Sequence, residues 1–262
     1  MFAAAKGCAP VVALLLANEL VNPDMQTPTG WTALMDAAEN GHAPVVTVLL
    51  ANQRVNPNMT DNGGFTALMV AAGKGRAPVV KLLLADKRVN PNMATQNDWT
   101  ALMLAARNGH APVVTLLLAD ERVDPNMTNK SGFTALMIAA HHGHAPVVTL
   151  LLADERVDPN MARQNGWTAL IFAASQGHAP VVTLLLADKR VDPNMTRKDG
   201  YTALLIAAGR GHAPVVTLLL ADERVDPNMA NQNGGTALML AALKGHAPVV
   251  TLLLADERVN RN

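Results

Sequence analysis

The 262-residue chain carries 21 basic and 21 acidic side chains, and half of its residues are apolar. Electrical neutrality excludes the strongly basic surface typical of nucleic-acid binding, and the apolar content excludes intrinsic disorder. A lone Cys8 excludes an intrachain disulfide, no apolar run reaches the roughly 18 residues of a membrane span, and the N-terminus lacks a signal-peptide pattern, so the sequence predicts a cytoplasmic protein.

An internal repeat organises the chain. The tripeptide Thr-Ala-Leu begins at Thr32 and recurs every 34 residues up to Thr236. The chain opens inside a half repeat, residues 1–25. Seven full repeats follow, and together they predict a single domain over 1–262. Their bounds are 26–59, 60–93, 94–127, 128–161, 162–195, 196–229 and 230–262.

Each full repeat predicts two helices and a loop. In residues 100–109, Thr100 is a candidate N-cap of a short helix and Gly109 a candidate terminator. Residues 110–122 place Pro112 in the first turn of a second helix that an apolar run fills. The remainder of the repeat, rich in Pro, Asn and Asp, predicts successive turns. A lone repeat cannot bury its apolar face, so repeats must stack, and buried leucines are expected at Leu116 and Leu150.

The pattern G-W-T-A-L-M-x-A-A-x-x-G-H followed by V-V-x-L-L-L resembles the ankyrin repeat family over essentially the whole chain. The family's T-P-L-H reads T-A-L-M here, the repeat has 34 residues rather than about 33, and the usual Gly after the second helix is missing. The resemblance implies an all-α ankyrin-repeat solenoid of helix-turn-helix units. It also implies a non-enzymatic scaffold that binds proteins through a concave groove of loop tips and first helices.

Comparison of the repeats separates a fixed scaffold from a few variable rows. The segment Gly109–Met127 recurs letter for letter at Gly143–Met161 and Gly211–Met229, and this fixed part answers to packing. By resemblance, three variable rows face the groove: the residue before Thr-Ala-Leu, the pair after Ala-Ala, and one loop position. A fourth row, which includes Phe172, is expected nearer the core. The candidate partner-binding residues are Trp31, Phe65, Trp99, Phe133, Trp167 and Tyr201 in the first row, Lys74, Arg107, Asn108, His141, His142, Ser175, Gln176, Arg210 and Lys244 in the second, and Arg163 and Arg197 in the third.

The charges of these rows predict the kind of partner. Six basic residues, Lys74, Arg107, Arg163, Arg197, Arg210 and Lys244, outnumber the acidic Asp36, Glu39 and Asp61. A mildly basic groove favours a protein with an acidic or mixed surface. Nucleic acid is disfavoured because the basic residues occur singly, one repeat apart. No cofactor and no membrane contact are expected.

Structural alternatives accompany each candidate. The aromatic row fits either binding or packing along the next loop, and the whole array fits either a binding scaffold or a spacer. The histidines at the fixed turn position, such as His110, are expected to be structural. The cluster of His141, His142 and His144 lacks a carboxylate or thiolate partner, so neither a metal site nor catalysis is predicted. The Asp-Glu-Arg triplets are expected to form a charge ladder between repeats.

The origin and the ends of the array are also open. Near-identical scaffolds with scattered variation are typical of a recently duplicated natural array and of a designed library, and irregularities such as Gln53, Arg76 and Lys81 favour duplication. Neither end carries an obvious cap, so the ends are expected to fray first. A monomer with a tendency to associate end to end is predicted.

Overall fold

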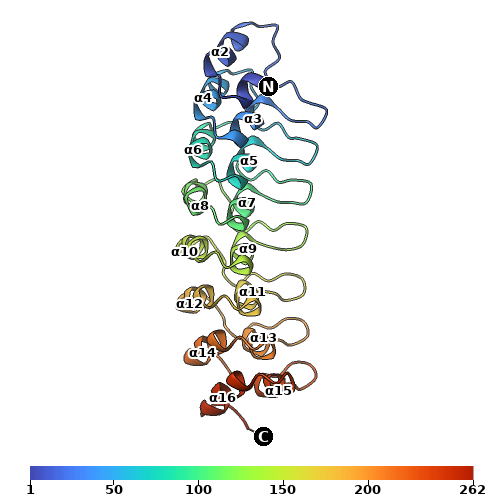
Figure 1. Ribbon diagram of the computed structural model, residues 1–262, viewed down its shortest axis with the longest axis vertical. Coiled ribbons are helices and arrows are strands. Elements are labelled where there is room, and N and C mark those ends of the chain that lie inside the picture. Colours follow the sequence, from blue (N-terminus) through green and yellow to red (C-terminus); the bar gives the residue numbers. More distant parts are fainter. Residues whose placement is uncertain (262) are drawn as a thin grey trace. The chain divides into compact units, whose positions relative to one another are not determined.

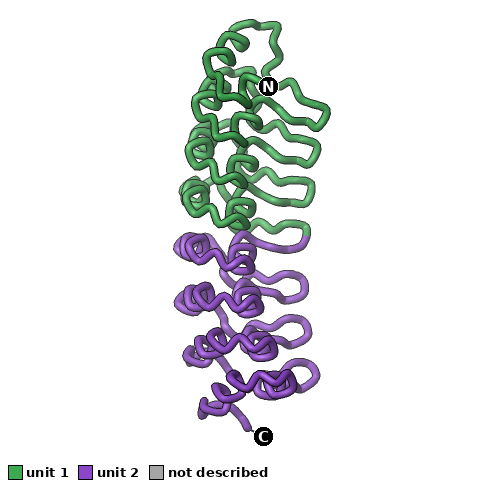
Figure 2. Tube along the Cα trace, viewed as in Figure 1, with its two compact units in different colours: residues 1–130 green, residues 131–262 purple. Residues whose placement is uncertain are grey.

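A computed structural model describes residues 1–261, and the chain divides into two compact units (Figure 2). Unit 1 spans residues 1–130, and unit 2 spans residues 131–262, of which the last lies outside the described part. The prediction of a single domain over the whole chain stays a prediction.

Helices carry the regular structure of both units, and the predicted all-α class is confirmed. Over the described residues the β-pairing is limited to an isolated bridge between Ala230 and Thr236. Unit 1 holds α1 (Phe2–Ala5), α2 (Ala9–Ala17), α3 (Ala33–Asn40), α4 (Ala43–Ala51), α5 (Ala67–Gly73), α6 (Ala77–Ala85), α7 (Ala101–Arg107) and α8 (Ala111–Leu118). Unit 2 holds α9 (Ala135–His142), α10 (Ala145–Ala153), α11 (Ala169–Gln176), α12 (Ala179–Ala187), α13 (Ala203–Arg210), α14 (Ala213–Ala221), α15 (Ala237–Leu243) and α16 (Ala247–Ala255).

Within each unit the helices form two parallel rows (Figure 1). The odd-numbered helices stack on one another beside the extended loops, and the even-numbered helices stack in the second row. The side formed by the loops and the odd-numbered helices is called the loop edge below. Within each unit, a helix therefore packs against its partner in the same repeat and against its counterpart in the neighbouring repeat of that unit.

Local signals in each repeat fix where the helices begin and end. The Thr100 Oγ1 accepts a hydrogen bond from the Met103 N–H (3.3 Å), which confirms the predicted N-cap of α7. Pro112 lies in the first turn of α8, where its missing N–H costs nothing. Gly109 follows α7 with φ of 71°, a left-handed conformation that glycine adopts without strain.

The buried face of the second helix lies one residue away from the expected position. Leu117 and Leu151 are fully buried, as are the Val-Val pairs of α4, α6, α8, α10, α12 and α14, whereas Leu116 and Leu150 are only half-buried. The prediction that Leu116 and Leu150 are buried is wrong. In an apolar run without polar interruptions, every position looks equally fit for the core, so the sequence does not mark which leucine faces the first helix.

A row of hydrogen bonds from the fixed turn position ties successive repeats. The His110 Nε2 donates to the Gly73 carbonyl oxygen (3.1 Å), and His178 and His212 make the same contact one repeat at a time within unit 2. Arg76 replaces histidine in one repeat, yet its Nε donates to the equivalent carbonyl of Glu39 (3.0 Å). The predicted structural role of the turn histidines is confirmed, and it joins neighbours rather than closing one turn.

A second polar row lies at the end of each second helix. Arg122 donates to the Val89 and Leu84 carbonyl oxygens of the preceding repeat (both 2.9 Å), and the same guanidinium pairs with Asp120 (2.6 Å). The Asp-Arg pair lies within one repeat, whereas the arginine reaches to its neighbour. The expected charge ladder is therefore a ladder of arginine-to-carbonyl hydrogen bonds, with Asp120 holding the arginine in place.

The loops are joined to one another through their backbones. The Gln96 N–H donates to the Gly63 carbonyl oxygen and the Lys130 N–H to the Asn97 carbonyl oxygen, at 3.0 and 3.2 Å. Asn92 adds a side-chain link, because its Nδ2 donates to the Arg122 carbonyl oxygen of the following repeat (2.6 Å). The loop edge is thus held as firmly as the helices behind it.

The position of the buried face leads to a stability prediction. We expect Leu117→Ala to lower the free energy of unfolding by about 2–5 kcal/mol, because it leaves a cavity in a dry, close-packed site. Leu116→Ala is the matched control and should cost clearly less, since its side chain is half-buried. Denaturant titration of both variants measures the difference. Equal losses would contradict the assignment of the buried face.

A pH dependence follows from the Asp-Arg pairs. Hydrogen bonds from the Arg122 side chain hold the pKa of Asp120 below its ordinary value of 3.8, although burial opposes them. A lowered pKa in the folded state adds stability above the ordinary value, and this is lost as the pH falls through the folded value. We expect Asp120→Asn to destabilise the protein at pH 7, and the difference from the unsubstituted chain to shrink below about pH 4.

The control for this effect is Asp124→Asn, because Asn90 occupies the equivalent position one repeat earlier. Unfolding titrations at pH 7 and in the acidic range measure both variants. A penalty of Asp120→Asn that stays constant over that range would contradict the role assigned to the ion pair.

Candidate partner-binding surface

The loop fixes each aromatic residue of the first row at the start of the first helix. In the third full repeat, the Trp99 carbonyl oxygen accepts a hydrogen bond from the Thr95 N–H (3.0 Å), and the Trp99 N–H donates to the Thr95 Oγ1 (3.1 Å). Because both backbone groups are held, the side chain leaves the loop in a fixed direction. The ring is half-buried, so part of its surface packs and part is open at the loop edge.

In unit 1 the loop edge is hollowed between two aromatic rings. Trp31 and Phe65 line a depression of about 320 Å³, and Met69, Val70 and Leu104 contribute apolar surface to it. The remaining lining residues are Glu39, Asp61, Gly73, Lys74 and Asn108.

Charged groups around this hollow already have partners within the protein. Lys74 and Glu39 form an ion pair (3.0 Å), and the Asp61 Oδ1 accepts hydrogen bonds from two loop N–H groups, those of Gly63 and Phe65 (both 2.8 Å). Burial raises the pKa of the nearby Asp36, against the opposing hydrogen bond from Trp31. The hollow therefore has the composition of a small ligand-contact site, apolar within and charged around it.

In unit 2 the aromatic residues form a connected stack. Phe172, which is 5% exposed, lies against Phe133 on one side and Trp167 on the other, with ring centroids 5.1 and 4.6 Å apart. The expectation that Phe172 lies nearer the core is confirmed. It is the one aromatic residue in its row, so it joins two half-buried rings that would otherwise lie one repeat apart.

Two arginines complete this stack in unit 2. The Arg163 guanidinium lies over the Phe133 ring at 4.2 Å from its centroid. Arg197 lies over both Trp167 and Tyr201, at 4.7 and 5.4 Å, and pairs with Asp199 (2.6 Å). Guanidinium and ring thus alternate along the loop edge, and each arginine lies within the range of cation–π attraction.

In other repeats, the residue at the position of these arginines forms hydrogen bonds within its own loop. That residue is Asp61, Thr95 or Asn231, whose side-chain oxygens accept hydrogen bonds from loop N–H groups. Arg163 and Arg197 have no acceptor to offer there. Two repeats of unit 2 therefore replace the loop acceptor with a cation that lies over an aromatic ring. Each arginine also makes a different loop contact, from the Arg163 Nε to the Ser131 carbonyl oxygen (2.7 Å) and from Arg197 to Asp199 (2.6 Å).

Beside the stack lie two groups that the protein leaves unsatisfied. The His141 Nδ1 and the Ser175 Oγ are buried without a hydrogen-bond partner. Burial lowers the pKa of His141, and the charge of His178 lowers it further. His141 also meets the edge of Phe172, at 5.5 Å between ring centroids. The His141 imidazole therefore belongs to the aromatic stack, and its burial there disfavours the charged form.

The structure separates the predicted site residues by exposure. Those exposed are Lys74, Arg107, Asn108, His142, Gln176, Arg210 and Lys244. Those half-buried are the six aromatic residues of the first row, His141, Arg163 and Arg197. Ser175 is 1% exposed, so it has no surface to offer a partner, and its inclusion among the partner-binding residues needs correction. The short serine side chain stays within the stack of helices, whereas the longer Arg107 at the same position of another repeat reaches solvent.

Charge is divided unevenly between the two units. Asp36, Glu39 and Asp61 all lie in unit 1, where they accompany Lys74 and Arg107. The other basic residues of the predicted groove, Arg163, Arg197, Arg210 and Lys244, all lie in unit 2. A single count of the charged groove residues over the whole sequence hides this difference. The basic character expected for the whole groove belongs to the loop edge of unit 2.

The sequence profile of ankyrin repeats in three copies matches residues 1–95, 53–129, 102–196 and 180–262. The chain belongs to the ankyrin repeat family. Ankyrin repeats generally serve as protein-interaction scaffolds and are typically non-enzymatic. Family membership is compatible with the apolar residue that replaces histidine in the T-A-L-M motif. The contact between repeats is made by the turn histidine instead.

Solved structures of this family superimpose on the chain. The ankyrin repeat protein EF0377 is 28% identical, with a TM-score of 0.68, over 74% of this chain and 97% of that one. The ankyrin repeat domain of Bcl-3, described as a unique member of the IkappaB protein family, is 27% identical with a TM-score of 0.77, over 86% and 99% of the two chains. The comparison with curated protein sequences gives no match.

Within residues 1–261, His, Cys, Asp and Glu side chains form no group of three or more that can hold a metal ion. None of the helices in this range has both the length and the apolar character needed to cross a membrane.

The loop arginines lead to a prediction about stability. We expect Arg163→Asn to change the free energy of unfolding by no more than about 1 kcal/mol, because Asn supplies the loop acceptor that Asn231 provides elsewhere. This gain offsets the loss of the cation–π contact and of the hydrogen bond from the Arg163 Nε to the Ser131 carbonyl oxygen (2.7 Å). Thermal and denaturant unfolding of Arg163→Asn and of Arg163→Ala, which restores no acceptor, measure the effect. A loss above about 1 kcal/mol in the Asn variant would show that the arginine stabilises the fold.

Proposed function

We propose that the chain is a non-enzymatic binding scaffold that recognises another protein through its loop edge. The observation that supports this most strongly is the stack of Arg163, Arg197 and their aromatic neighbours in unit 2. Arginine and large aromatic residues are enriched at the energetic centres of interfaces, because they combine a large contact area with groups that can hydrogen-bond. Contacts with the rings, Ser131 and Asp199 hold these guanidinium groups in place before binding, which lowers the entropy lost on binding.

The chemistry of the two units indicates what each would contact. The loop edge of unit 2 carries four basic side chains of the predicted set and favours an acidic segment, to which arginine can donate paired hydrogen bonds. The hollow of unit 1, between Trp31 and Phe65, favours one large apolar side chain of the partner. A partner of mixed surface meets both requirements. A cytoplasmic setting remains part of this proposal.

The alternative function is a spacer that binds nothing along its loop edge. The half-burial of the aromatic rings and the stacking of Phe133 and Trp167 on Phe172 favour a packing role for part of that row. The arginines are the residues to vary, because Arg163 and Arg197 combine a loop contact with a cation over a ring, whereas Asn at the same position keeps a loop contact and carries no cation. The decisive variants are therefore changes of arginine rather than of the rings alone.

The experiment compares proteins captured from a cell lysate by the unsubstituted chain and by Arg163→Asn combined with Arg197→Asn. A partner should be lost from the variant and retained by Glu121→Ala, a change at an exposed helix-end residue away from the loop edge. With the purified partner, Trp167→Ala should weaken binding by about 2 kcal/mol or more, roughly thirtyfold, and Trp99→Ala and Phe133→Ala are expected to act in the same direction. Substitution of Arg107 or Arg210 at the polar rim should cost less.

Melting temperatures recorded for every variant separate binding from folding. If Trp167→Ala lowers stability as much as Leu117→Ala while the affinity stays the same, the ring only packs. If the arginine variant keeps every captured protein, the loop edge is not the binding surface and the spacer becomes the better description.

A further inference from the structure

Two arginines of unit 2 carry hydrogen-bond donors that no residue in the described part of the chain accepts. Arg163 lies over the Phe133 ring and its Nε donates to the Ser131 carbonyl oxygen (2.7 Å), whereas neither of its Nη groups has an acceptor there. Arg197 donates only from its Nη2, to Asp199 (2.6 Å). A positioned guanidinium with spare N–H groups is suited to a carboxylate, whose two oxygens accept parallel hydrogen bonds from it.

The aromatic stack sets the distance between the two arginines. Each lies over the aromatic residue of the preceding repeat, Arg163 over Phe133 and Arg197 over Trp167, so the guanidinium groups are spaced as those rings are. Phe172 lies between the rings, with its centroid 5.1 Å from Phe133 and 4.6 Å from Trp167. The two rings, and with them the two cations, are thus at most about 10 Å apart.

A polyproline II helix repeats over the same distance. It has three residues per turn and rises about 3.1 Å per residue, so side chains three residues apart lie on one face about 9 Å apart. In a β-strand, residues three apart point to opposite faces. An α-helix offers this spacing only between residues seven apart, over about 10.5 Å. Two carboxylates three residues apart in a polyproline II segment can therefore meet both arginines at once.

The rings favour the polyproline II form over the α-helix. Phe133, Trp167 and Tyr201 are half-buried, so each leaves part of an apolar surface open at the loop edge. Proline-rich segments of this conformation bind surfaces lined by aromatic residues, and they lose little entropy because the conformation is formed beforehand. The alternation of ring and cation along the loop edge matches an alternation of proline and acidic residues along the segment.

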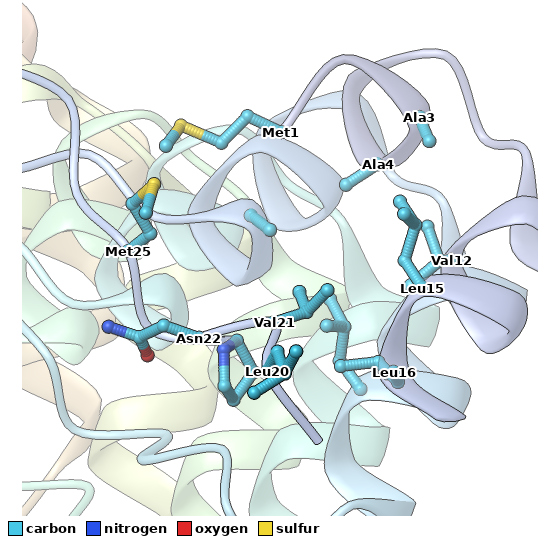
Figure 3. A pocket seen from close by; sticks show the side chains of 13 residues that line it. Met1, Ala3, Ala4, Val12, Leu15, Leu16, Leu20, Val21, Asn22 and Met25 are labelled. Carbon is cyan, nitrogen blue, oxygen red and sulfur yellow. The ribbon is translucent and has the colours of Figure 1, made fainter. Parts of the chain in front are cut away.

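Two apolar hollows of unit 1 do not offer this combination. One, of about 380 Å³, is shown in Figure 3, and no charged side chain lines it. In the other, between Trp31 and Phe65, Lys74 is already paired with Glu39 (3.0 Å). An acidic segment is therefore attracted to the loop edge of unit 2 rather than to either hollow.

We propose that the loop edge of unit 2 binds an acidic, proline-rich segment in the polyproline II conformation, with carboxylates three residues apart on Arg163 and Arg197. This rests on the proposed function and names the chemistry of the partner. Arg163 is the stronger position, because Asp199 already neutralises part of the charge of Arg197. Asn165 and Asn233 occupy the place of Asp199 in the neighbouring repeats, so the loop does not require a carboxylate there.

The test is fluorescence anisotropy of labelled peptides titrated with the 262-residue chain up to about 1 mM. The probe, Pro-Pro-Glu-Pro-Pro-Glu-Pro-Pro, carries glutamates three residues apart. One control, Pro-Pro-Glu-Pro-Glu-Pro-Pro-Pro, carries them two apart and on different faces, and a second has glutamine in place of both. We expect the probe to bind about fivefold more tightly than either control, because each control loses at least one carboxylate contact.

Two results of this titration overturn the proposal. Equal affinity for the probe and for the peptide with glutamates two apart would show that the spacing of the arginines is not read. Tighter binding of an alanine-rich helical peptide with glutamates seven apart would show that the segment is an α-helix instead.

Variants of the chain locate the contact. Arg163→Asn should weaken binding of the probe about fivefold or more, and Arg197→Asn should weaken it less. Asp199→Asn should tighten it about threefold, since it removes a competing carboxylate. Lys189→Gln removes one positive charge at the exposed end of α12, away from the loop edge, and should leave the affinity unchanged. If it weakens binding as much as Arg163→Asn does, net charge alone attracts the peptide and the proposal fails.

The peptide titration and the lysate capture can fail separately. If Arg163→Asn combined with Arg197→Asn loses a captured protein while the unsubstituted chain binds no probe, the loop edge binds a partner of another kind and only the present proposal falls. If the variant also keeps every captured protein, both proposals fall.

Discussion

Each repeat has more apolar helix surface than it can bury by itself, and the need to cover this surface determines how the repeats are arranged. The second helices are apolar on nearly every side, and a pair of short helices cannot enclose them. Burial is completed only by the helices of the neighbouring repeats, so the neighbour is part of every core. Hydrogen bonds then fix the spacing: histidine and arginine donors reach to carbonyl groups of the preceding repeat, and loop amides join loop to loop.

Much of this could be read from the sequence because its signals are local and repeated. The period of 34 residues, Thr100 as a cap and Pro112 in a first turn each constrain a few adjacent residues, and seven copies reinforce the reading. The leucine that faces the core could not be identified, because α8 is apolar at consecutive positions and its orientation depends on its partner helix. The structural role of the turn histidine was inferred from resemblance. Its partner, a carbonyl oxygen of the preceding repeat, could be identified only from the structure.

The candidate surface was harder to predict, since it depends on contacts between repeats. Membership of the variable rows was visible, but the burial of Ser175 and the bridging role of Phe172 arise from side chains one repeat away. The division of charge between the two units was visible in principle, yet a sum over the whole chain concealed it. Loop arginines such as Arg163 could have been singled out on the sequence alone, because Thr, Asn and Asp at the same position have a known use in turns and arginine has none.

The acceptors that join the repeats are backbone carbonyls, and this has a consequence for how such a chain can change. The residues that supply the carbonyl to the turn histidine or arginine include Ala5, Glu39, Gly73, His141, Ser175 and Gly209, six equivalent positions occupied by five different residue types. A carbonyl is present whatever side chain the residue carries, so the joint tolerates any substitution there that fits the space. Repeats built in this way are interchangeable: duplication, deletion or reordering of whole repeats rearranges the variable side chains while every joint keeps its donor and acceptor. New combinations at the loop edge can therefore arise without passing through a misfolded intermediate sequence.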